Sequence, residues 1–251
     1  MSNNWQIDQN YRVLVVDDDK FVLQYMRQLL GRIGCCFIYQ ATDGEEAIEI
    51  LLKNKIDLVF LDIKMAPTNG LDALKSIRTG LHGLRRDIPA IFLTSANDDE
   101  VLGTALALDC NAFLPKPASI AEINEKMKRI QASSFHVKPS IAYQVINTKE
   151  VVKVKNLAET KRQVFIPPNA TIISLDELSP GQVLAIDVCT LSGGVLLTAN
   201  TMLTSQHIEK LNDIGFSTQI GRVAIKNSSQ RRITPDRQLN EAGIAYEAFK
   251  I

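Results

Sequence analysis

The chain has 251 residues, of which 45% are hydrophobic and 22% charged, and its formal net charge is zero. This composition is typical of a folded globular protein, and it excludes both a disordered chain and a chain that binds polyanions through overall charge. The length favours two domains over one. Because no leader pattern or bilayer-spanning apolar run is present, we expect a cytoplasmic protein with no membrane partner.

The first half alternates between short apolar runs and amphipathic segments. Residues 12–16 are a β-branched apolar run that ends in three acids, which is typical of a buried strand with a polar end. From Lys20, apolar residues recur at helical spacing as far as the glycines at 31 and 34. The pattern repeats, with strands expected at 36–39, 57–61, 88–93 and 112–114, and helices expected from Asp43, Gly70, Asp98 and Ala118. In the last helix, Ile120, Ile123, Met127 and Ile130 share one face.

Five strand-helix units in about 130 residues predict a doubly wound α/β domain with a five-stranded parallel sheet, because parallel neighbours need crossover helices. In such folds functional groups gather at the carboxyl ends of the strands. Here those ends carry Asp17, Asp18, Asp19, Asp62, Thr94, Ser95 and Lys116. The sequence therefore predicts a single polar site at one edge of the sheet.

The predicted site suits phosphoryl transfer. Carboxylates gathered at two strand ends repel one another unless a cation compensates them, and oxygen ligands suit Mg²⁺. Phosphoryl transfer to a carboxylate needs charge neutralisation, which Mg²⁺ and the Lys116 ammonium could supply. The Thr94 hydroxyl could donate to a phosphoryl oxygen, so it would make a contact that exists only in the modified state.

Four motifs resemble those of the receiver domain of two-component response regulators. They are Val-Val-Asp17-Asp18-Asp19, Leu-Asp62-Ile-Lys-Met, Leu-Thr94-Ser and Pro-Lys116-Pro117, in the family's order and spacing. The resemblance implies the flavodoxin-like fold of that domain, and it implies that Asp62 accepts a phosphoryl group from a histidine kinase or phosphotransfer protein. It also implies that Asp17, Asp18, Asp62 and the Lys64 backbone carbonyl bind Mg²⁺, that Thr94 and Lys116 contact the phosphate, and that Phe113 is an aromatic switch residue.

Some positions depart from the family pattern or admit a second interpretation. The usual Met-Pro is Met65-Ala66-Pro67, although Gly70 keeps its distance from Asp62, and Ser95 replaces a small residue. Phe113 lacks the hydroxyl of a tyrosine and could simply pack in the core. Asp19 is expected to cap the first helix rather than to bind metal. A folded pseudo-receiver that is never phosphorylated remains an alternative.

The remaining cysteines and histidines predict no further site. The chain has no Cys-x-x-Cys, so we expect buried thiols rather than a disulfide framework or zinc site at Cys35, Cys36, Cys110 and Cys189. The histidines at 82, 136 and 207 are scattered without an acidic partner, which favours surface or packing roles.

The second half predicts a smaller β-rich domain. We expect a receiver domain at 1–132, a linker at 133–145, the β-rich domain at 146–226 and a polar tail at 227–251 that contains Arg231, Arg232 and Arg237. Strands are expected at 151–154, 163–166, 182–186 and 195–198. One helix is expected from Ser205 to Asp213, ending at Gly215.

The runs that begin at Leu178, Gly193 and Leu203 resemble a β-rich module that accompanies HD-type phosphohydrolase regulators. No His-Asp metal dyad follows them, so we predict a non-catalytic module for protein interaction or dimerisation, controlled by the receiver. A DNA-binding output would need a helix-turn-helix and a basic face, and a catalytic output on a cyclic dinucleotide would need metal-ligand or Gly-rich motifs. The sequence favours neither, and we expect no nucleic-acid partner.

Overall fold

A computed structural model describes residues 7–95, 101–148, 166–190, 194–218 and 220–227, and the side chains of 216–218 are left out of the description. Its main feature is a sheet of five parallel strands in the order β2-β1-β3-β4-β5. The strands are β1 (Arg12–Val16), β2 (Phe37–Ala41), β3 (Leu58–Asp62), β4 (Ala90–Thr94) and β5 (Ala112–Pro115). The predicted doubly wound, flavodoxin-like fold is confirmed.

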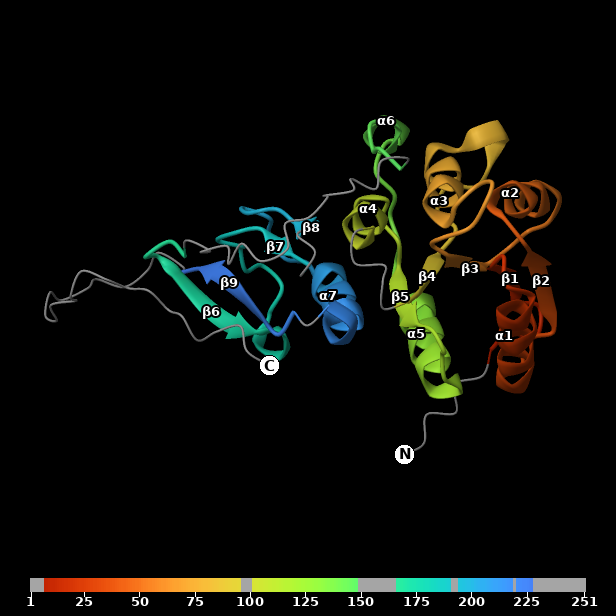
Figure 1. The fold of residues 1–251 in the computed structure, drawn as a ribbon, viewed down its shortest axis with the longest axis horizontal. Helices are drawn as coiled ribbons and strands as arrows, with labels where there is room; N and C mark the ends of the chain where they lie inside the picture. Colours follow the sequence, from red (N-terminus) through yellow and green to blue (C-terminus); the bar gives the residue numbers. More distant parts are fainter. Residues whose placement is uncertain (1–6, 96–100, 149–165, 191–193, 219, 228–251) are drawn as a thin grey trace, which may run out of the picture.

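Helices cover both faces of this sheet (Figure 1). They are α1 (Lys20–Ile33), α2 (Gly44–Lys53), α3 (Gly70–Thr79), α4 (Leu102–Ala107) and α5 (Ile120–Ala132). Side chains alternate between faces along each strand, so Val13 and Val15 pack in the core with α1 and α5, whereas Leu14 and Val16 pack in the core with the other three helices. The predicted start of the fourth helix at Asp98 lies outside the described residues.

Helix ends follow the capping chemistry of the sequence. Asp19 has extended backbone geometry and accepts a hydrogen bond from the Phe21 amide at 2.8 Å, so it is the N-cap of α1, as expected. Gly34 ends the helix in a left-handed conformation with φ of 104°. Ser119 and Glu122 form a capping box, so α5 begins two residues after the predicted Ala118.

The segment expected as a linker contains a helix, α6 (Ser140–Gln144), that packs against α3. Tyr143 is buried; its hydroxyl donates to Asp109 Oδ2 at 2.8 Å and accepts from the Lys138 amide. The linker prediction missed this helix because it is short and its packing depends on contacts with α3 that lie far away in the sequence, such as the hydrogen bond from the Ser140 hydroxyl to the Thr79 carbonyl. The division into domains at 1–132, 133–145, 146–226 and 227–251 remains a prediction.

The C-terminal region contains two small antiparallel sheets and one long helix. Strands β6 (Ala170–Ser174) and β9 (Arg222–Lys226) form one pair, with the short helix η2 (Leu175–Glu177) after β6, and strands β7 (Val188–Cys189) and β8 (Val195–Leu197) form the other. The run at 182–186 forms isolated bridges rather than a named strand. The strand predicted at 151–154, residues 163–165 of the strand predicted at 163–166, and the three arginines of the tail lie outside the described residues.

The long helix, α7 (Ser205–Thr218), continues through Gly215, so the prediction that Gly215 ends it is wrong. A Cβ atom at this glycine would lie 2.9 Å from Leu175 Cδ1. The glycine therefore permits close packing of α7 against η2, a long-range requirement that resembles a helix stop in the sequence. No helix within the described ranges combines the length and apolar character needed to span a bilayer.

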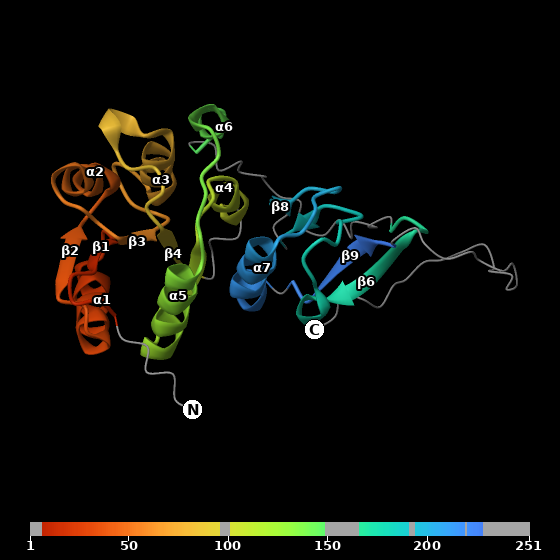
Figure 2. The ribbon, with the colours of Figure 1, turned by 180° about the vertical axis from the view of Figure 1, so that it is seen from behind.

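The C-terminal region packs directly on the five-stranded α/β fold. Helix α7 lies against β5, and β8 lies against α4, in both views of the chain (Figures 1 and 2). One apolar cluster continues from Phe92 and Phe113 of the five-stranded sheet to Leu196, Leu211 and Ile214 of the C-terminal region. The two parts therefore share a core.

Candidate functional site

Three carboxylates meet at the carboxyl ends of β1 and β3. Asp17 and Asp18 directly follow β1, and Asp62 is the last residue of the adjacent strand β3. One carboxylate oxygen from each of the three lies within 4.8 Å of the others. Asp17 and Asp62 are buried whereas Asp18 is exposed, so the cluster has two inner acids and one at the solvent boundary.

Lys116 joins this cluster from the loop after β5. Its Nζ donates a hydrogen bond to Asp62 Oδ1 at 2.8 Å and lies 2.6 Å from Asp17 Oδ2 as an ion pair. The Lys116 amide donates to the Thr94 carbonyl at 2.8 Å, which fixes the lysine beside β4. The structure therefore brings together the two inner acids and the lysine that the sequence predicted.

Burial and charge act in opposite directions on these groups. Burial raises the pKa of Asp62 above its ordinary value, although the hydrogen bond and charge of Lys116 oppose the shift. Burial alone would lower the pKa of Lys116, but hydrogen bonds to Asp17 and Asp62 outweigh it, and the pKa is raised. The lysine is therefore held in its charged form by the two acids.

The donor set fits a divalent cation with oxygen ligands. Asp17 Oδ2 is buried and lies 2.6 Å from the Lys116 ammonium group, and no other donor among the residues that the structure describes reaches it. A buried carboxylate oxygen in this state favours a further positive partner. Carboxylates from Asp17, Asp18 and Asp62 could hold Mg²⁺, which keeps several waters and needs few protein ligands.

The loop after β3 returns closely over Asp62. A Cβ atom at Gly70 would lie 2.0 Å from the Asp62 carbonyl oxygen, and the Gly70 amide donates to the Ile63 carbonyl at 3.2 Å. The glycine is therefore required by the approach of two backbone segments. Ala66 belongs to this loop, and the Ala66–Pro67 peptide is cis.

The predicted switch residues Thr94 and Phe113 are both buried. Thr94 is 6% exposed, and its hydroxyl donates to the Leu114 carbonyl at 3.4 Å, a long hydrogen bond. Phe113 is 1% exposed and stacks on Phe92 with ring centroids 6.3 Å apart. The packing interpretation of Phe113 agrees with this position, whereas its switch role stays a prediction.

Sequence reasoning missed Asp213 of α7, which contacts the edge of the receiver sheet. Its carboxylate accepts hydrogen bonds from the Phe113 amide at 3.2 Å and from Lys126 Nζ at 2.6 Å. Arg129 adds two more, at 2.7 and 3.1 Å. A single acid on a predicted surface helix carries no sequence signal for such a contact.

The other candidate residues lie apart from this site. His82 and His136 are exposed, and His207 is half-buried and accepts from the Thr204 amide at 3.3 Å, so all three have the predicted surface or packing roles. Cys35 and Cys110 are buried free thiols, as expected, but Cys36 is exposed and Cys189 half-buried, so the expectation of four buried thiols is wrong. Cys36 directly precedes β2, which is an edge strand of the five-stranded sheet.

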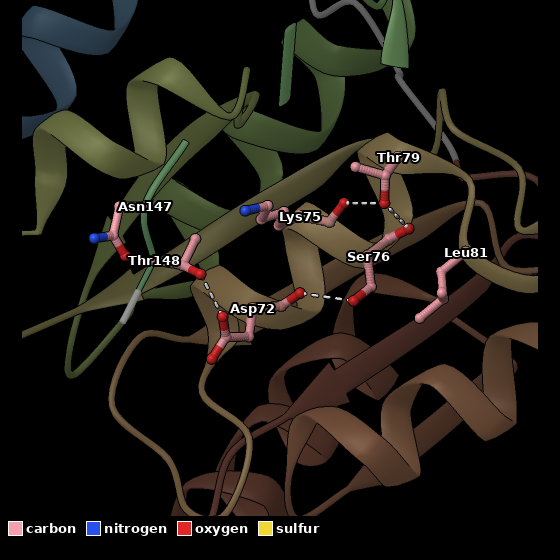
Figure 3. A pocket seen from close by; sticks show the side chains of 7 residues that line it. All are labelled: Asp72, Lys75, Ser76, Thr79, Leu81, Asn147 and Thr148. Atoms are coloured by element: carbon pink, nitrogen blue, oxygen red, sulfur yellow. Dashed lines mark hydrogen bonds between the residues drawn. The ribbon is translucent and has the colours of Figure 1, made fainter. Parts of the chain in front are cut away.

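A separate cavity of about 330 Å³ lies between α3 and the segment after α6 (Figure 3). Within it, Thr148 is hydrogen-bonded to Asp72, and the hydroxyls of Ser76 and Thr79 donate to helix carbonyls. The residues that line it are Asp72, Lys75, Ser76, Thr79, Leu81, Asn147 and Thr148. None belongs to the acidic cluster, so the cavity is not part of the candidate site.

Comparison with known proteins gives matches to response regulators and to their receiver domain. The family model of the response regulator receiver domain matches residues 13–128. CpxR of Escherichia coli, a transcriptional regulatory protein, is 36% identical over 121 residues, which are 47% of this chain and 48% of CpxR. A protein-glutamate methylesterase/protein-glutamine glutaminase of Pyrococcus horikoshii is 36% identical over 120 residues, which are 46% of this chain and 31% of that protein.

Solved structures also match about half of the chain. The receiver domain of the Francisella response regulator 1452 is 30% identical, with 48% of this chain and 99% of that chain covered and a TM-score of 0.42. The chain spans about half the length of CpxR, and its matches to CpxR and to the methylesterase identify no output domain. Residues 13–128 are therefore a response regulator receiver domain of the two-component type.

Proposed function

We propose that the chain is a two-component response regulator in which Asp62 accepts a phosphoryl group from a histidine kinase or phosphotransfer protein. The observation that carries the proposal is the position of Asp62, a buried carboxylate at the end of β3 beside Asp17 and Lys116. An Asp62 oxygen forms a bond to phosphorus while the bond between phosphorus and the donor's imidazole nitrogen breaks. A cytoplasmic location belongs to the same proposal.

In this proposal Asp17, Asp18, Asp62 and the Lys64 carbonyl hold Mg²⁺. The bound ion would reduce the repulsion between the anionic acceptor and the anionic donor. Lys116 places its ammonium group 2.8 Å from Asp62 Oδ1, where it can pair with a phosphoryl oxygen after transfer. The remaining buried acid, Asp17, keeps that lysine charged and oriented.

The switching step follows from the contacts of Thr94. Its hydroxyl now donates to the Leu114 carbonyl over 3.4 Å, so little free energy opposes its turning toward a phosphoryl oxygen. The aspartyl phosphate adds charge and three acceptor oxygens, which supply the differential contacts that a two-state switch needs. Phe113, which neighbours Leu114 in β5, would repack as that strand adjusts.

We propose a protein-interaction or dimerisation role for the C-terminal region. In the described part of residues 166–227, α7 is the one α-helix, which does not favour a helix-turn-helix. The described residues there also contribute to no group of three metal-ligating side chains. CpxR is named a transcriptional regulator, but its match to this chain covers 121 residues, so a DNA-binding output is the alternative that a mobility-shift assay would test.

The phosphoacceptor proposal is tested by incubating the full chain with Mg²⁺ and acetyl phosphate. We expect the mass of one phosphoryl group to be added, and we expect no gain with Asp62→Asn or in EDTA. Asp19→Asn is the matched control: it makes the same chemical change beside the site, and asparagine caps a helix as well as aspartate does. A wild-type chain that gains no mass would be a pseudo-receiver, and an undiminished gain in Asp62→Asn would move the acceptor to another residue.

A further inference from the structure

The outer edge of the receiver sheet is covered by the C-terminal region. Strand β5 lies at the edge of the sheet, so one row of its backbone N–H groups has no strand partner. The Phe113 amide belongs to this row and donates to Asp213 Oδ2 of α7 at 3.2 Å. A side chain 100 positions away in the chain thus satisfies a backbone donor at the proposed switch residue.

The same carboxylate is the centre of a buried charge cluster. Asp213 is 2% exposed as a side chain, and it pairs with Lys126 at 2.6 Å and with Arg129 at 2.7 Å, both on α5. Charge-assisted hydrogen bonds of this kind are stronger and more directional than neutral ones. Loss of the carboxylate would leave two largely covered cations with weaker partners, so Asp213 anchors α7 to α5 and β5 together.

A second, independent contact holds β8 on α4. A Cβ atom at Gly103 of α4 would lie 2.1 Å from the Val195 carbonyl oxygen, so the two backbones touch in a way that only glycine allows. Apolar side chains of β8 and α7 join the same core cluster as Leu106 of α4 and Phe113 of β5. The C-terminal region therefore contacts all three elements: β8 lies against α4, and α7 lies against β5 and is paired with α5 through Asp213 (Figure 2).

We propose that docking of the C-terminal region on this α4–β5–α5 surface opposes phosphorylation of Asp62, with Asp213 as the anchor; this rests on the proposed function. The docked arrangement is the one in which Thr94 donates to the Leu114 carbonyl and Asp213 holds the amide of the preceding residue, Phe113. A phosphoryl group that draws Thr94 away from Leu114 favours a different arrangement of β5. Because the two equilibria are thermodynamically linked, docking of the C-terminal region weakens binding of the phosphoryl group, and the phosphoryl group weakens docking by the same factor.

The test measures the affinity of the full chain for beryllofluoride, a mimic of the phosphoryl group, in the presence of Mg²⁺. Amide exchange of Phe113, measured by NMR, reports docking in the same samples. Two variants undock the region from different sides: Asp213→Asn removes the anchor charge, and Gly103→Ala introduces the clash with β8. Alanine suits a helix better than glycine, so Gly103→Ala leaves α4 intact. Asp187→Asn makes the matched charge change in the same region, at an exposed side chain that accepts a hydrogen bond from the Ala199 amide at 2.7 Å.

We expect both undocking variants to exchange the Phe113 amide faster and to bind beryllofluoride at least about five-fold more tightly than the wild type, the lower end of typical coupling. Asp187→Asn should match the wild type in both measurements. If the Phe113 amide exchanged faster while the affinity for beryllofluoride stayed unchanged, the coupling between docking and phosphorylation would be overturned. If amide exchange were unchanged in Asp213→Asn, the role of Asp213 as the anchor would be overturned. If no chain binds beryllofluoride, the proposed function fails first, and this inference falls with it.

Discussion

Lys116 connects the stability of the fold to the charge of the candidate site. The substitution Lys116→Met keeps the length of the side chain and removes the ammonium group that lies 2.6 Å from Asp17 and 2.8 Å from Asp62. The acid side chains are 1% and 8% exposed, and that of the lysine is 21% exposed. Without Mg²⁺, two buried carboxylates would then face each other with no cation between them.

The expected loss can be estimated from the burial of the three groups. Removing one partner of a buried ion pair typically costs 3–5 kcal/mol, and partial exposure of the lysine places this pair at about 3 kcal/mol. Mg²⁺ should restore part of the lost stability, because a ligand that binds only the folded state, at a concentration ten times its Kd, stabilises the fold by about 1.4 kcal/mol. In Lys116→Met the lysine no longer competes with the metal for the two acids, so Mg²⁺ should stabilise the variant more than the wild type. The difference between their free energies of unfolding should therefore become smaller as Mg²⁺ is added.

The assay is urea unfolding of both chains in EDTA and in saturating Mg²⁺. Lys53→Met is the control, because Lys53 pairs with Glu49 on the surface at 71% and 69% side-chain exposure, and such pairs contribute about 0.5 kcal/mol or less. A Lys116→Met chain within about 0.5 kcal/mol of the wild type in EDTA would refute the buried cluster. If Mg²⁺ left the difference in the free energy of unfolding unchanged, the assignment of the acids as Mg²⁺ ligands would be refuted.

Three further predictions concern separate features. Gly70→Ala places a Cβ atom 2.0 Å from the Asp62 carbonyl, so it should cost about 1–3 kcal/mol in urea unfolding and slow phosphorylation by acetyl phosphate; wild-type values for both would contradict the close loop. Tyr143→Phe removes the hydroxyl bonded to Asp109, so thermal unfolding should show a loss of about 1 kcal/mol, and no loss would mean that α6 is not docked. Burial, together with the charge of Lys210, lowers the pKa of His207 in the folded state. The folded chain should therefore lose stability as the pH falls below about 6.5, the pKa of histidine in the unfolded chain. If a His207→Gln chain lost stability with pH as steeply as the wild type, His207 would not be the cause.

The sequence predicted the receiver sheet well because each of its strands is signalled locally. A buried parallel strand is a short apolar run, and the polar groups that follow it mark its carboxyl end. The sequence therefore predicts that Asp62, Asp17 and Lys116 lie together at the carboxyl edge of the sheet. Asp19 was recognised as a cap for a similar reason, since capping depends on the residues that directly follow it.

The C-terminal region was predicted less well because its elements depend on distant partners. Strands β6 and β9 pair across about 50 residues, so each depends on a partner that lies far away in the sequence. Gly215 was read as a helix end, although its role is to admit Leu175. The anchor Asp213 finds its partners on β5 and α5, so no local pattern could have revealed it.

The central claim is that Asp62 is phosphorylated, and direct mapping of the modified residue tests it most closely. The full chain is treated with acetyl phosphate and Mg²⁺, the acyl phosphate is reduced with borohydride, and the reduced residue is located by peptide mass spectrometry. The account predicts reduction at Asp62, strongly diminished in Lys116→Met and unchanged in Asp19→Asn. Reduction at any other acid, or at none, would contradict it.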